Sequence, residues 1–327
     1  MVVASATVED ERPTIKGRAK DLLRSSPALY KTISAAYRQL NVLQGLSYVA
    51  KQAPKLMMGA RPIVVSYASV PRPRWGYGLP GHARLYALID QNRAAYQTLI
   101  LSFANHRAAL EAIPDTSPVE GPEYWNNDYF SGLDAVALYG LLALHKPRRY
   151  FEIGSGYSTQ LARRAVRDLS LPTTVLSIDP SPQSVISAAC DRIIRQPLED
   201  VDVSLFDELE AGDILFFDGS HHAFTNSDVV VFWMEILPRL KPGVLVQIHD
   251  IFLPYDYPPA WLDRYYSEQY LLAVALLNPS VALEVVFPVA FVGEDPALSR
   301  LVAETIGPRG TGSGASFWLK TRAPSAP

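Results

Sequence analysis

The second half of the chain alternates short runs of β-branched or aromatic residues with helix-forming stretches, beginning at Arg149. Strands buried on both faces of a parallel sheet read as short apolar runs, because helices cover the two faces. The pattern therefore predicts an α/β fold: a Rossmann-like, doubly wound, seven-stranded and mostly parallel sheet with helices on both faces. The expected strands are Tyr150–Ile153, Thr174–Asp179, Arg192–Ile194, Asp213–Asp218, Val244–His249, Leu283–Val289 and Ser316–Lys320. The expected helices cover residues 158–170, 181–190, 203–210, 225–238, 260–277 and 296–306.

The residues before the sheet are expected to combine a mobile arm over residues 1–27, helices, and an irregular Pro- and Gly-rich segment over residues 61–81. They also carry an excess of basic side chains. From Arg12 to Arg84 there are 13 Lys or Arg residues but one acid, Asp21, within a chain whose net charge is −3. Apolar residues at helical spacing predict one long amphipathic helix from Leu85 to Leu110. The predicted parts are a basic N-terminal arm with a helical extension (1–81), a helical cap (82–147) and the Rossmann-like domain (148–327).

Composition limits the partners and the compartment. The near balance of 30 basic and 33 acidic residues is unlike a dedicated nucleic-acid binder, so no nucleic-acid partner is expected. The single cysteine, Cys190, excludes an internal disulfide framework, so we expect a reducing compartment and a cytoplasmic protein. The apolar stretch Tyr270–Gly293 is interrupted by Pro279 and Pro288, which favours a buried helix end and a core strand over a membrane span. The basic arm could contact an anionic membrane surface, but docking on the rest of the chain or within a homo-oligomer is the simpler expectation.

The strongest local signal is a glycine turn between the first expected strand and the helix after it, with the residues Glu152-Ile153-Gly154-Ser155-Gly156-Tyr157-Ser158. Glycines let the backbone approach a ligand closely, and the free N–H groups of a helix start favour an anionic group. Asp179 ends the second expected strand, where its carboxylate can accept hydrogen bonds from both hydroxyls of a ribose. Thr159 stands where a dinucleotide-binding turn has its third glycine, which weakens a nicotinamide-dependent oxidoreductase as an alternative.

Two further polar clusters stand at the ends of the fourth and fifth expected strands. The first runs from Asp218 to His222, and the second is the pair His249-Asp250. Ligands of parallel sheets bind outside the carboxyl ends of the strands, and these two strands should be neighbours. We therefore expect four ionisable side chains to meet in one cleft. They are Asp218, His221, His249 and Asp250. The run Tyr255–Pro259 predicts a rigid aromatic loop over the cleft, or a plain helix entry.

The pattern Glu-x-Gly-x-Gly with its Ser/Thr-rich continuation resembles motif I of class I S-adenosylmethionine-dependent methyltransferases. Residues from about 122 to 320 resemble a subgroup of that family with a Phe-Asp-Gly-Ser-His and a His-Asp-Ile-Phe-Leu-Pro stretch. The resemblance implies that the glycine turn faces the methionine part of the cofactor, that Asp179 holds the ribose and that Pro197 lies near the adenine. The implied cofactor-binding residues are Glu152, Gly154, Ser155, Gly156, Tyr157, Ser158, Asp179, Pro197 and Asp218.

The same resemblance leaves two possibilities for the ionisable cluster. Similar catechol and macrolide-sugar O-methyltransferases bind a divalent cation here, so Asp218, His249 and Asp250 could hold Mg²⁺ or Mn²⁺, although His249 replaces a usual acid. Alternatively, His221 or His249 is a general base oriented by a neighbouring carboxylate.

The implied activity is in-line methyl transfer from S-adenosylmethionine to a hydroxyl of a small molecule or sugar. The implied catalytic residues are His221, His249 and Asp250. A nicotinamide-dependent oxidoreductase and a non-catalytic S-adenosylmethionine-binding scaffold remain as alternatives.

Overall fold

The computed structural model describes residues 70–116, 124–278, 280–312 and 314–323. The chain divides into two compact units, Met1–Val70 and Pro71–Pro327, and every element given below belongs to the second. The predicted boundary at residue 81 falls inside that second unit. The predicted helical extension and most of the basic arm lie outside the described residues.

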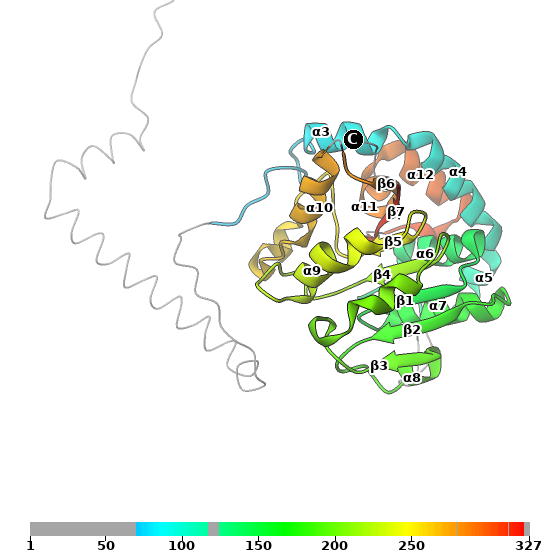
Figure 1. Ribbon diagram of the computed structural model, residues 1–327. Helices are drawn as coiled ribbons and strands as arrows, with labels where there is room; N and C mark the ends of the chain where they lie inside the picture. The colour runs from blue at the N-terminus through cyan, green and yellow to red at the C-terminus, as the bar shows by residue number, and fades with distance from the viewer. Residues whose placement is uncertain (1–69, 117–123, 279, 313, 324–327) are drawn as a thin grey trace, which may run out of the picture. The chain divides into compact units, whose positions relative to one another are not determined.

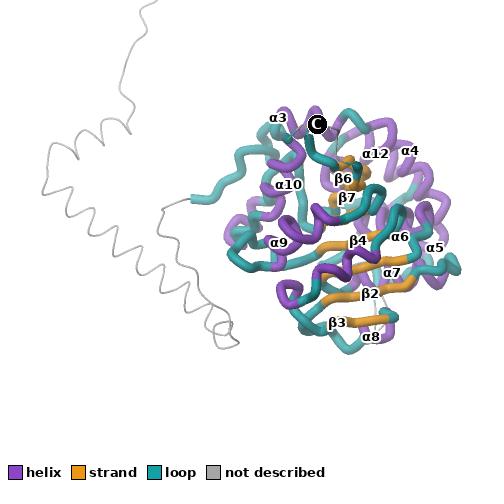
Figure 2. Tube along the Cα trace, viewed as in Figure 1, coloured by secondary structure: helices purple, strands orange, loops and turns teal. Residues whose placement is uncertain are grey.

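Seven strands form one sheet in the order β3-β2-β1-β4-β5-β7-β6 (Figures 1 and 2). The strands are β1 Arg149–Ile153, β2 Thr174–Ile178, β3 Arg192–Ile194, β4 Ile214–Phe217, β5 Leu245–Ile248, β6 Leu283–Pro288 and β7 Phe317–Thr321. The pairs from β3 to β5 are parallel, whereas β7 runs antiparallel to both of its neighbours. The predicted seven-stranded, mostly parallel sheet is confirmed, and no strand end differs from its expected position by more than one residue.

The helices alternate with these strands along the chain. They are α3 Ala83–Asp90, α4 Arg93–Phe103, α5 Arg107–Glu111, α6 Gly132–His145, α7 Tyr157–Asp168, α8 Ile186–Ala189, α9 Asp228–Val231, α10 Glu268–Leu277, α11 Val289–Glu294 and α12 Pro296–Thr305. Short 3-10 segments are Ala104–His106, Leu198–Asp200, Val203–Glu208, Leu237–Arg239, Pro259–Arg264 and Pro308–Gly310, and a π-helical turn covers Phe232–Ile236. The predicted helices over 181–190, 203–210, 225–238 and 260–277 are therefore shorter or more irregular than expected.

Helices cover both faces of the sheet, as the aromatic residues of β4 show. Consecutive residues of a strand point to opposite faces. Phe217 stacks on Phe232 of the π-helical turn after α9, with ring centroids 4.1 Å apart. Phe216, on the other face, meets Phe130 just before α6 in an edge-on contact at 5.7 Å. The doubly wound fold class is thus confirmed.

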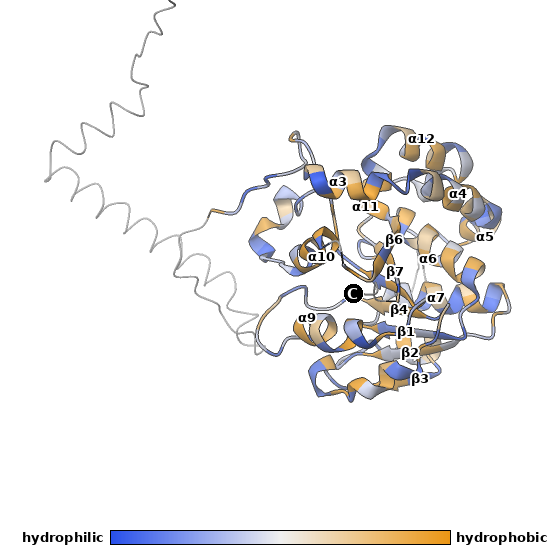
Figure 3. Ribbon diagram, turned by 45° about the horizontal axis from the view of Figure 1, so that its top comes forward, coloured by the Kyte–Doolittle hydropathy of each residue, from blue (hydrophilic) through white to orange (hydrophobic). Residues whose placement is uncertain are grey.

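The predicted long helix over Leu85–Leu110 is wrong, because the structure has α3, α4 and α5 with breaks between them. At the first break the Asn92 side chain donates a hydrogen bond to the carbonyl oxygen of Val285, 2.9 Å away. Arg93, at the start of α4, pairs with the carboxylate of Asp295 at 2.7 Å. Contacts with distant parts of the chain accompany this break, and helical spacing alone does not reveal them. Helices α4 and α12 pack against each other and carry both hydrophobic and hydrophilic residues (Figure 3).

The apolar stretch Tyr270–Gly293 forms most of α10, strand β6 and most of α11. The expected buried helix end and core strand are present, but α11 was not expected, since Val289–Val292 has the composition of a strand. Pro288, the last residue of β6, is extended and directly precedes the first residue of α11. None of the helices in the described part of the chain is long and apolar enough to cross a membrane.

The strand order reverses between β1 and β4, since β2 and β3 lie on one side of β1, and β4 and β5 on the other. The last residues of β1 and β4, Ile153 and Phe217, are register partners. The Asp218 N–H donates to the carbonyl oxygen of Ile153 at 2.9 Å, so the segments that follow the two strands start side by side. A crevice outside such a reversal point is the usual ligand site of an open α/β sheet.

Candidate active site

The glycine turn after β1 is closely packed at its first glycine and open at its second. Gly154 has a φ of +85°, and a Cβ there would lie 2.3 Å from the carbonyl oxygen of Asp218. A Cβ on Gly156 would meet nothing within 4 Å. Thr159, which replaces the third glycine of a dinucleotide turn, accepts a hydrogen bond from the Gly156 N–H at 3.0 Å and so caps α7. The turn therefore leaves space for a ligand beside the start of α7.

Glu152 and Ser158 lie beneath this turn. The Glu152 side chain is fully buried, and one of its oxygens accepts a hydrogen bond from the Ser158 hydroxyl. Its other oxygen is buried without a partner among the described residues. Burial raises the pKa of Glu152 to about 8, against the opposing effect of the Ser158 hydrogen bond, so the carboxyl group is mostly protonated at neutral pH. A neutral, buried carboxyl group linked to the turn supports its conformation.

The next strand brings Asp179 to the same edge of the sheet. Its carboxylate accepts hydrogen bonds from the Ser155 hydroxyl and from the N–H of Ser181, the latter at 2.7 Å. Ser155 belongs to the glycine turn, so the carboxylate directly adjoins that turn. Pro197 follows β3, the strand beyond β2, and precedes the 3-10 segment Leu198–Asp200.

Tyrosines surround the start of α7. The hydroxyls of Tyr157 and Tyr124 are 2.8 Å apart, and the ring of Tyr129 stacks on Tyr157 with centroids 5.9 Å apart. Tyr129 is 77% exposed, so its ring forms an open wall near the turn. The predicted cofactor-binding residues from β1, α7 and β2 thus meet at one edge of the sheet.

His221 joins the ends of β4 and β5. Its Nε2 lies 3.3 Å from both Asp218 Oδ1 and Asp250 Oδ2, and its Nδ1 lies 3.1 Å from Glu268 Oε2. His221 and Asp250 have left-handed φ values of 61° and 57°, a conformation that costs energy for such residues and is common at functional sites. The expected meeting of residues from the two strands is therefore present. Burial opposes a charged imidazole here, but the hydrogen bonds with Asp218 and Glu268 raise the pKa of His221 to about 11.

Glu268 is a member of this cluster that the sequence did not reveal. It is 0% exposed, and it accepts a hydrogen bond from Trp233 Nε1 at 3.4 Å in addition to its contact with His221. Burial raises the pKa of Glu268 to about 7, while His221 opposes that shift. An acid in the first turn of a helix is ordinary, so its position in the sequence gave no signal.

His249 lies on the other side of Asp250. Its Nε2 is 3.7 Å from Asp250 Oδ1, and its Nδ1 is 3.3 Å from the hydroxyl of Ser316. Burial disfavours the charged imidazole, but the carboxylates of Asp218 and Asp250 outweigh that effect and raise the pKa of His249 above its usual value. Burial also raises the pKa of Asp250, and the two histidines lower it only in part.

The structure gives no support to the expected Mg²⁺ or Mn²⁺ site at Asp218, His249 and Asp250. The imidazole of His221 lies between the two carboxylates, at 3.3 Å from each, and an ion shared by them would have to displace it. Within the described ranges, no three His, Cys, Asp or Glu side chains form a group that could hold a metal ion. The residues as arranged do not fit the metal.

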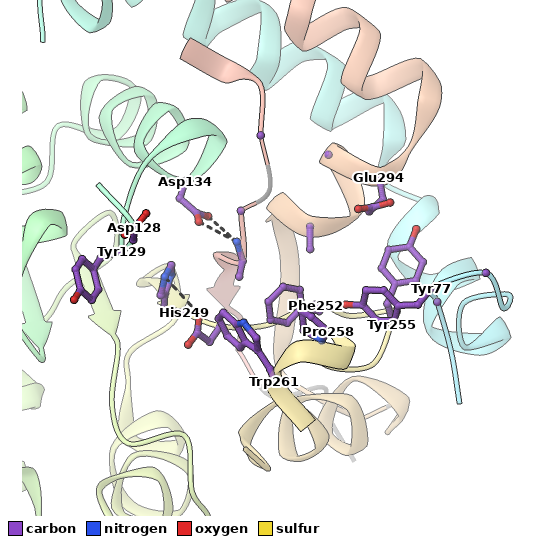
Figure 4. A pocket seen from close by; sticks show the side chains of 18 of the residues that line it. Tyr77, Asp128, Tyr129, Asp134, His249, Phe252, Tyr255, Pro258, Trp261 and Glu294 are labelled. Carbon is purple, nitrogen blue, oxygen red and sulfur yellow. Dashed lines mark hydrogen bonds and ion pairs between the residues drawn. The ribbon is translucent and has the colours of Figure 1, made fainter. Parts of the chain in front are cut away.

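A cavity of about 820 Å³ opens beside this cluster, within the range of small-molecule sites (Figure 4). His249 and Asp250 line it, whereas His221 does not. Aromatic walls come from three parts of the chain. They include Tyr77, Tyr129, Phe252, Tyr255 and Trp261. Both alternatives for Tyr255–Pro259 are present, since Tyr255 and Pro258 line this cavity and Pro259 begins the 3-10 segment Pro259–Arg264.

Comparison with known proteins supplies a family for the central part of the chain. Residues 151–251, which run from β1 to the residue after Asp250, match the model of a methyltransferase domain. An uncharacterized protein of Archaeoglobus fulgidus is 32% identical over 93 residues, or 27% of this chain and 42% of that protein. The match therefore spans less than half of the length of that curated relative.

Solved structures similar to the chain include two methyltransferases. A methyltransferase of Podospora anserina with S-adenosylhomocysteine bound gives a TM-score of 0.38 at 16% identity, covering 76% of this chain and 100% of that chain. A plantazolicin methyltransferase in complex with S-adenosylhomocysteine gives a TM-score of 0.33 at 14% identity, covering 74% of this chain and 90% of that chain.

Proposed function

We propose that this chain, whose residues 151–251 are a methyltransferase domain of the class I S-adenosylmethionine-dependent type, methylates a hydroxyl group of a small molecule. The observation that carries the proposal is the position of the His249-Asp250 pair. The pair lines a cavity of small-molecule size, and it follows β5, the neighbour of the strand whose end adjoins the glycine turn. A proton acceptor thus lies where a hydroxyl could meet a methyl donor.

The edge of the sheet from β1 to β2 suits the cofactor. The open space over Gly156 and the start of α7 can take the methionine part, and the Asp179 carboxylate can bind the ribose hydroxyls in place of Ser155. When bound, S-adenosylmethionine supplies an electrophilic methyl group on a positively charged sulfur. Asp218 lies between this edge and the histidines and is partly exposed, so it is available to both.

His249 is the proposed general base. A neutral hydroxyl must lose its proton as the new oxygen–carbon bond forms and the carbon–sulfur bond breaks, and a base within hydrogen-bond reach promotes this. His249 lines the cavity, its Nε2 faces Asp250, and the carboxylate stabilises the imidazolium that forms. Alignment of the hydroxyl with the methyl group in the cavity supplies a further part of the acceleration.

His221 has a different proposed role. Its pKa of about 11 keeps it protonated at neutral pH, so it cannot accept a proton there. Its contacts with Asp218, Asp250 and Glu268 instead fix the Asp250 carboxylate beside His249. We therefore assign His221 as a positioning residue. Of the two possibilities for this cluster, a divalent cation or a histidine general base, the arrangement favours the general base.

Two other functions, an oxidoreductase and a non-catalytic scaffold, remain to be compared with this proposal. The match of residues 151–251 to a methyltransferase domain goes against a nicotinamide-dependent oxidoreductase, as does the use of Thr159 to cap α7. A scaffold that binds the cofactor without turnover predicts that removing the histidines changes nothing measurable beyond stability.

The test combines cofactor binding with turnover. Calorimetric titration with S-adenosylhomocysteine should show binding to the wild-type protein and to His249→Ala. With labelled S-adenosylmethionine and a panel of hydroxyl-bearing compounds, His249→Ala should lose methyl transfer by about 10²- to 10⁴-fold. His145→Ala, at the end of α6, is the matched control and should retain activity. Absence of S-adenosylhomocysteine binding, or full turnover by His249→Ala, would contradict the proposal.

A further inference from the structure

The cavity beside His249 has an acidic lining. Its acids are Asp128, Asp134, Asp250 and Glu294, and no Lys or Arg is among the described residues that line it. Asp134 is 4% exposed and accepts hydrogen bonds from the N–H groups of Ala315 at 2.9 Å and of Ser316 at 2.7 Å, so its charge is already compensated. Asp250 is likewise paired, with the protonated His221 at 3.3 Å. The exposed Asp128 and Glu294 are therefore the acids in this lining that would repel a phosphate or carboxylate on an acceptor and attract a cation.

Glu294 is the acid in this lining whose surroundings most resemble a cation site. It is the last residue of α11, it is exposed, and its carboxylate forms no hydrogen bond or ion pair within the described part of the chain. Its carboxylate points toward the rings of Tyr77 and Tyr255, which line the same cavity (Figure 4). Burial raises the pKa of both phenols, that of Tyr255 to about 12, and the charge of Glu294 adds a smaller increase to each.

The two rings are held in place before any ligand binds. Tyr77 has a left-handed φ of 54° between two glycines, and its hydroxyl donates to the carbonyl oxygen of Asp256 at 3.0 Å. The N–H of Trp75 donates to a carboxylate oxygen of the same Asp256 at 3.2 Å. A Cβ at Gly76 would lie 2.9 Å from the Cβ of Tyr255, so the segment before α3 packs directly on that ring. Binding of a ligand would therefore cost little conformational entropy at these two side chains.

Two fixed phenol rings beside an unpaired carboxylate form a site for a positively charged nitrogen. The faces of aromatic rings attract a cation electrostatically, and the carboxylate adds an ion pair. Figure 4 shows His249 on the opposite side of the cavity from Glu294, with Phe252 and Trp261 between them. An acceptor could therefore be held at one end while its other end meets the base.

We propose that the methyl acceptor carries a cationic amino group, which Glu294, Tyr77 and Tyr255 bind, and that a separate hydroxyl of the same molecule reaches His249. This inference rests on the proposed function, because it names the class of acceptor for the same cavity. The amine anchors the acceptor, and the hydroxyl is the group that is methylated.

The test uses three phenols that differ only at the far end of the molecule: tyramine, tyrosol and 4-hydroxyphenylacetate, which are cationic, neutral and anionic. Their binding to the full chain saturated with S-adenosylhomocysteine is measured by calorimetry and saturation-transfer NMR. We expect tyramine to bind at least about tenfold more tightly than tyrosol, and 4-hydroxyphenylacetate more weakly than either. Glu294→Gln should remove the preference for tyramine without changing the affinity for S-adenosylhomocysteine.

Asp128→Asn is the matched control, since it removes another exposed carboxylate from the same cavity and should keep most of the preference. An equal loss in Asp128→Asn would overturn the assignment to Glu294. Failure of tyramine to bind better than tyrosol, including no binding by any of the three, would overturn the proposal itself. Both results are distinct from loss of S-adenosylhomocysteine binding, which would instead contradict the proposed function.

Discussion

Two histidines follow neighbouring strands, and their immediate contacts give them different chemistry. His221 is enclosed by three carboxylates, from Asp218, Asp250 and Glu268, and has no place in the cavity lining. His249 has one close carboxylate and lines the cavity. The first histidine is thus suited to hold charges in position and the second to accept a proton.

The pH dependence of turnover should report on His249. The rate should rise with pH through the raised pKa of His249, because only the neutral imidazole accepts a proton. Asp250→Asn removes one of the negative charges that raise this pKa, so the rising limb should move to lower pH and the maximal rate should fall. The measurement is kcat/KM against pH for both proteins. An unchanged limb in Asp250→Asn would show that another group is the base.

The pH dependence of stability should report on His221. Its pKa is about 11 in the folded protein against about 6.5 when unfolded, so the folded state binds the proton more tightly. The resulting stabilisation is complete below pH 6.5 and is lost as pH rises toward 11. Urea unfolding at several pH values should show a steeper fall in the free energy of unfolding for the wild-type protein than for His221→Gln. Parallel curves would contradict the protonated state assigned to His221.

Removal of divalent cations should leave methyl transfer unchanged, because the His221 imidazole lies where a metal would join Asp218 and Asp250. Activity is measured after treatment with EDTA and after adding back Mg²⁺ or Mn²⁺. Loss of activity on chelation, with recovery on addition of either metal, would show that the imidazole moves aside and that the metal site expected from the resemblance forms.

At the scale of elements, the turn between β1 and α7 contains two glycines, one that the fold requires and one that it does not. Gly154 must be glycine for the fold, because its φ is +85° and because an added Cβ would collide with the carbonyl oxygen of Asp218. Gly156 has free space around it, so the fold does not require a glycine there. The sequence presents both as one motif, and only the surrounding chain distinguishes them.

This difference gives a paired prediction. Gly154→Ala should lower the free energy of unfolding by about 1–3 kcal/mol, because it places a side chain in a strained and crowded position. Gly156→Ala should keep the wild-type thermal stability but weaken binding of S-adenosylhomocysteine, because its methyl group enters the proposed cofactor space. Thermal unfolding and calorimetry on both variants provide the readouts. Wild-type cofactor affinity in Gly156→Ala would argue against this location of the cofactor.

Elements whose pattern is local could be predicted from the sequence, and those set by distant contacts could not. The strands were predicted to within one residue, because buried parallel strands are short apolar runs between turn signals. The break between α3 and α4 involves contacts from Asn92 and Arg93 to residues about two hundred positions away, at Val285 and Asp295. The helical spacing of apolar residues does not indicate such long-range contacts.

At the scale of the whole molecule, strand order decides which predicted residues meet. The sequence indicated that the ends of β1, β2, β4 and β5 carry the polar residues, and the order β2-β1-β4-β5 places those ends along one edge. The cavity wall was not predictable in the same way. Tyr77 and Glu294 come from segments far apart in the chain, and no local sequence pattern links the two.

The central claim is that a methyl donor lies along this edge, with its sugar at Asp179 and its reactive end toward the cavity. A crystal structure of the protein with S-adenosylhomocysteine tests it most directly. The account predicts ribose hydroxyls hydrogen-bonded to the Asp179 carboxylate, and a sulfur atom that faces the side of the cavity formed by His249 and Asp250. S-adenosylhomocysteine bound elsewhere, or with its sulfur directed away from that cavity, would contradict it.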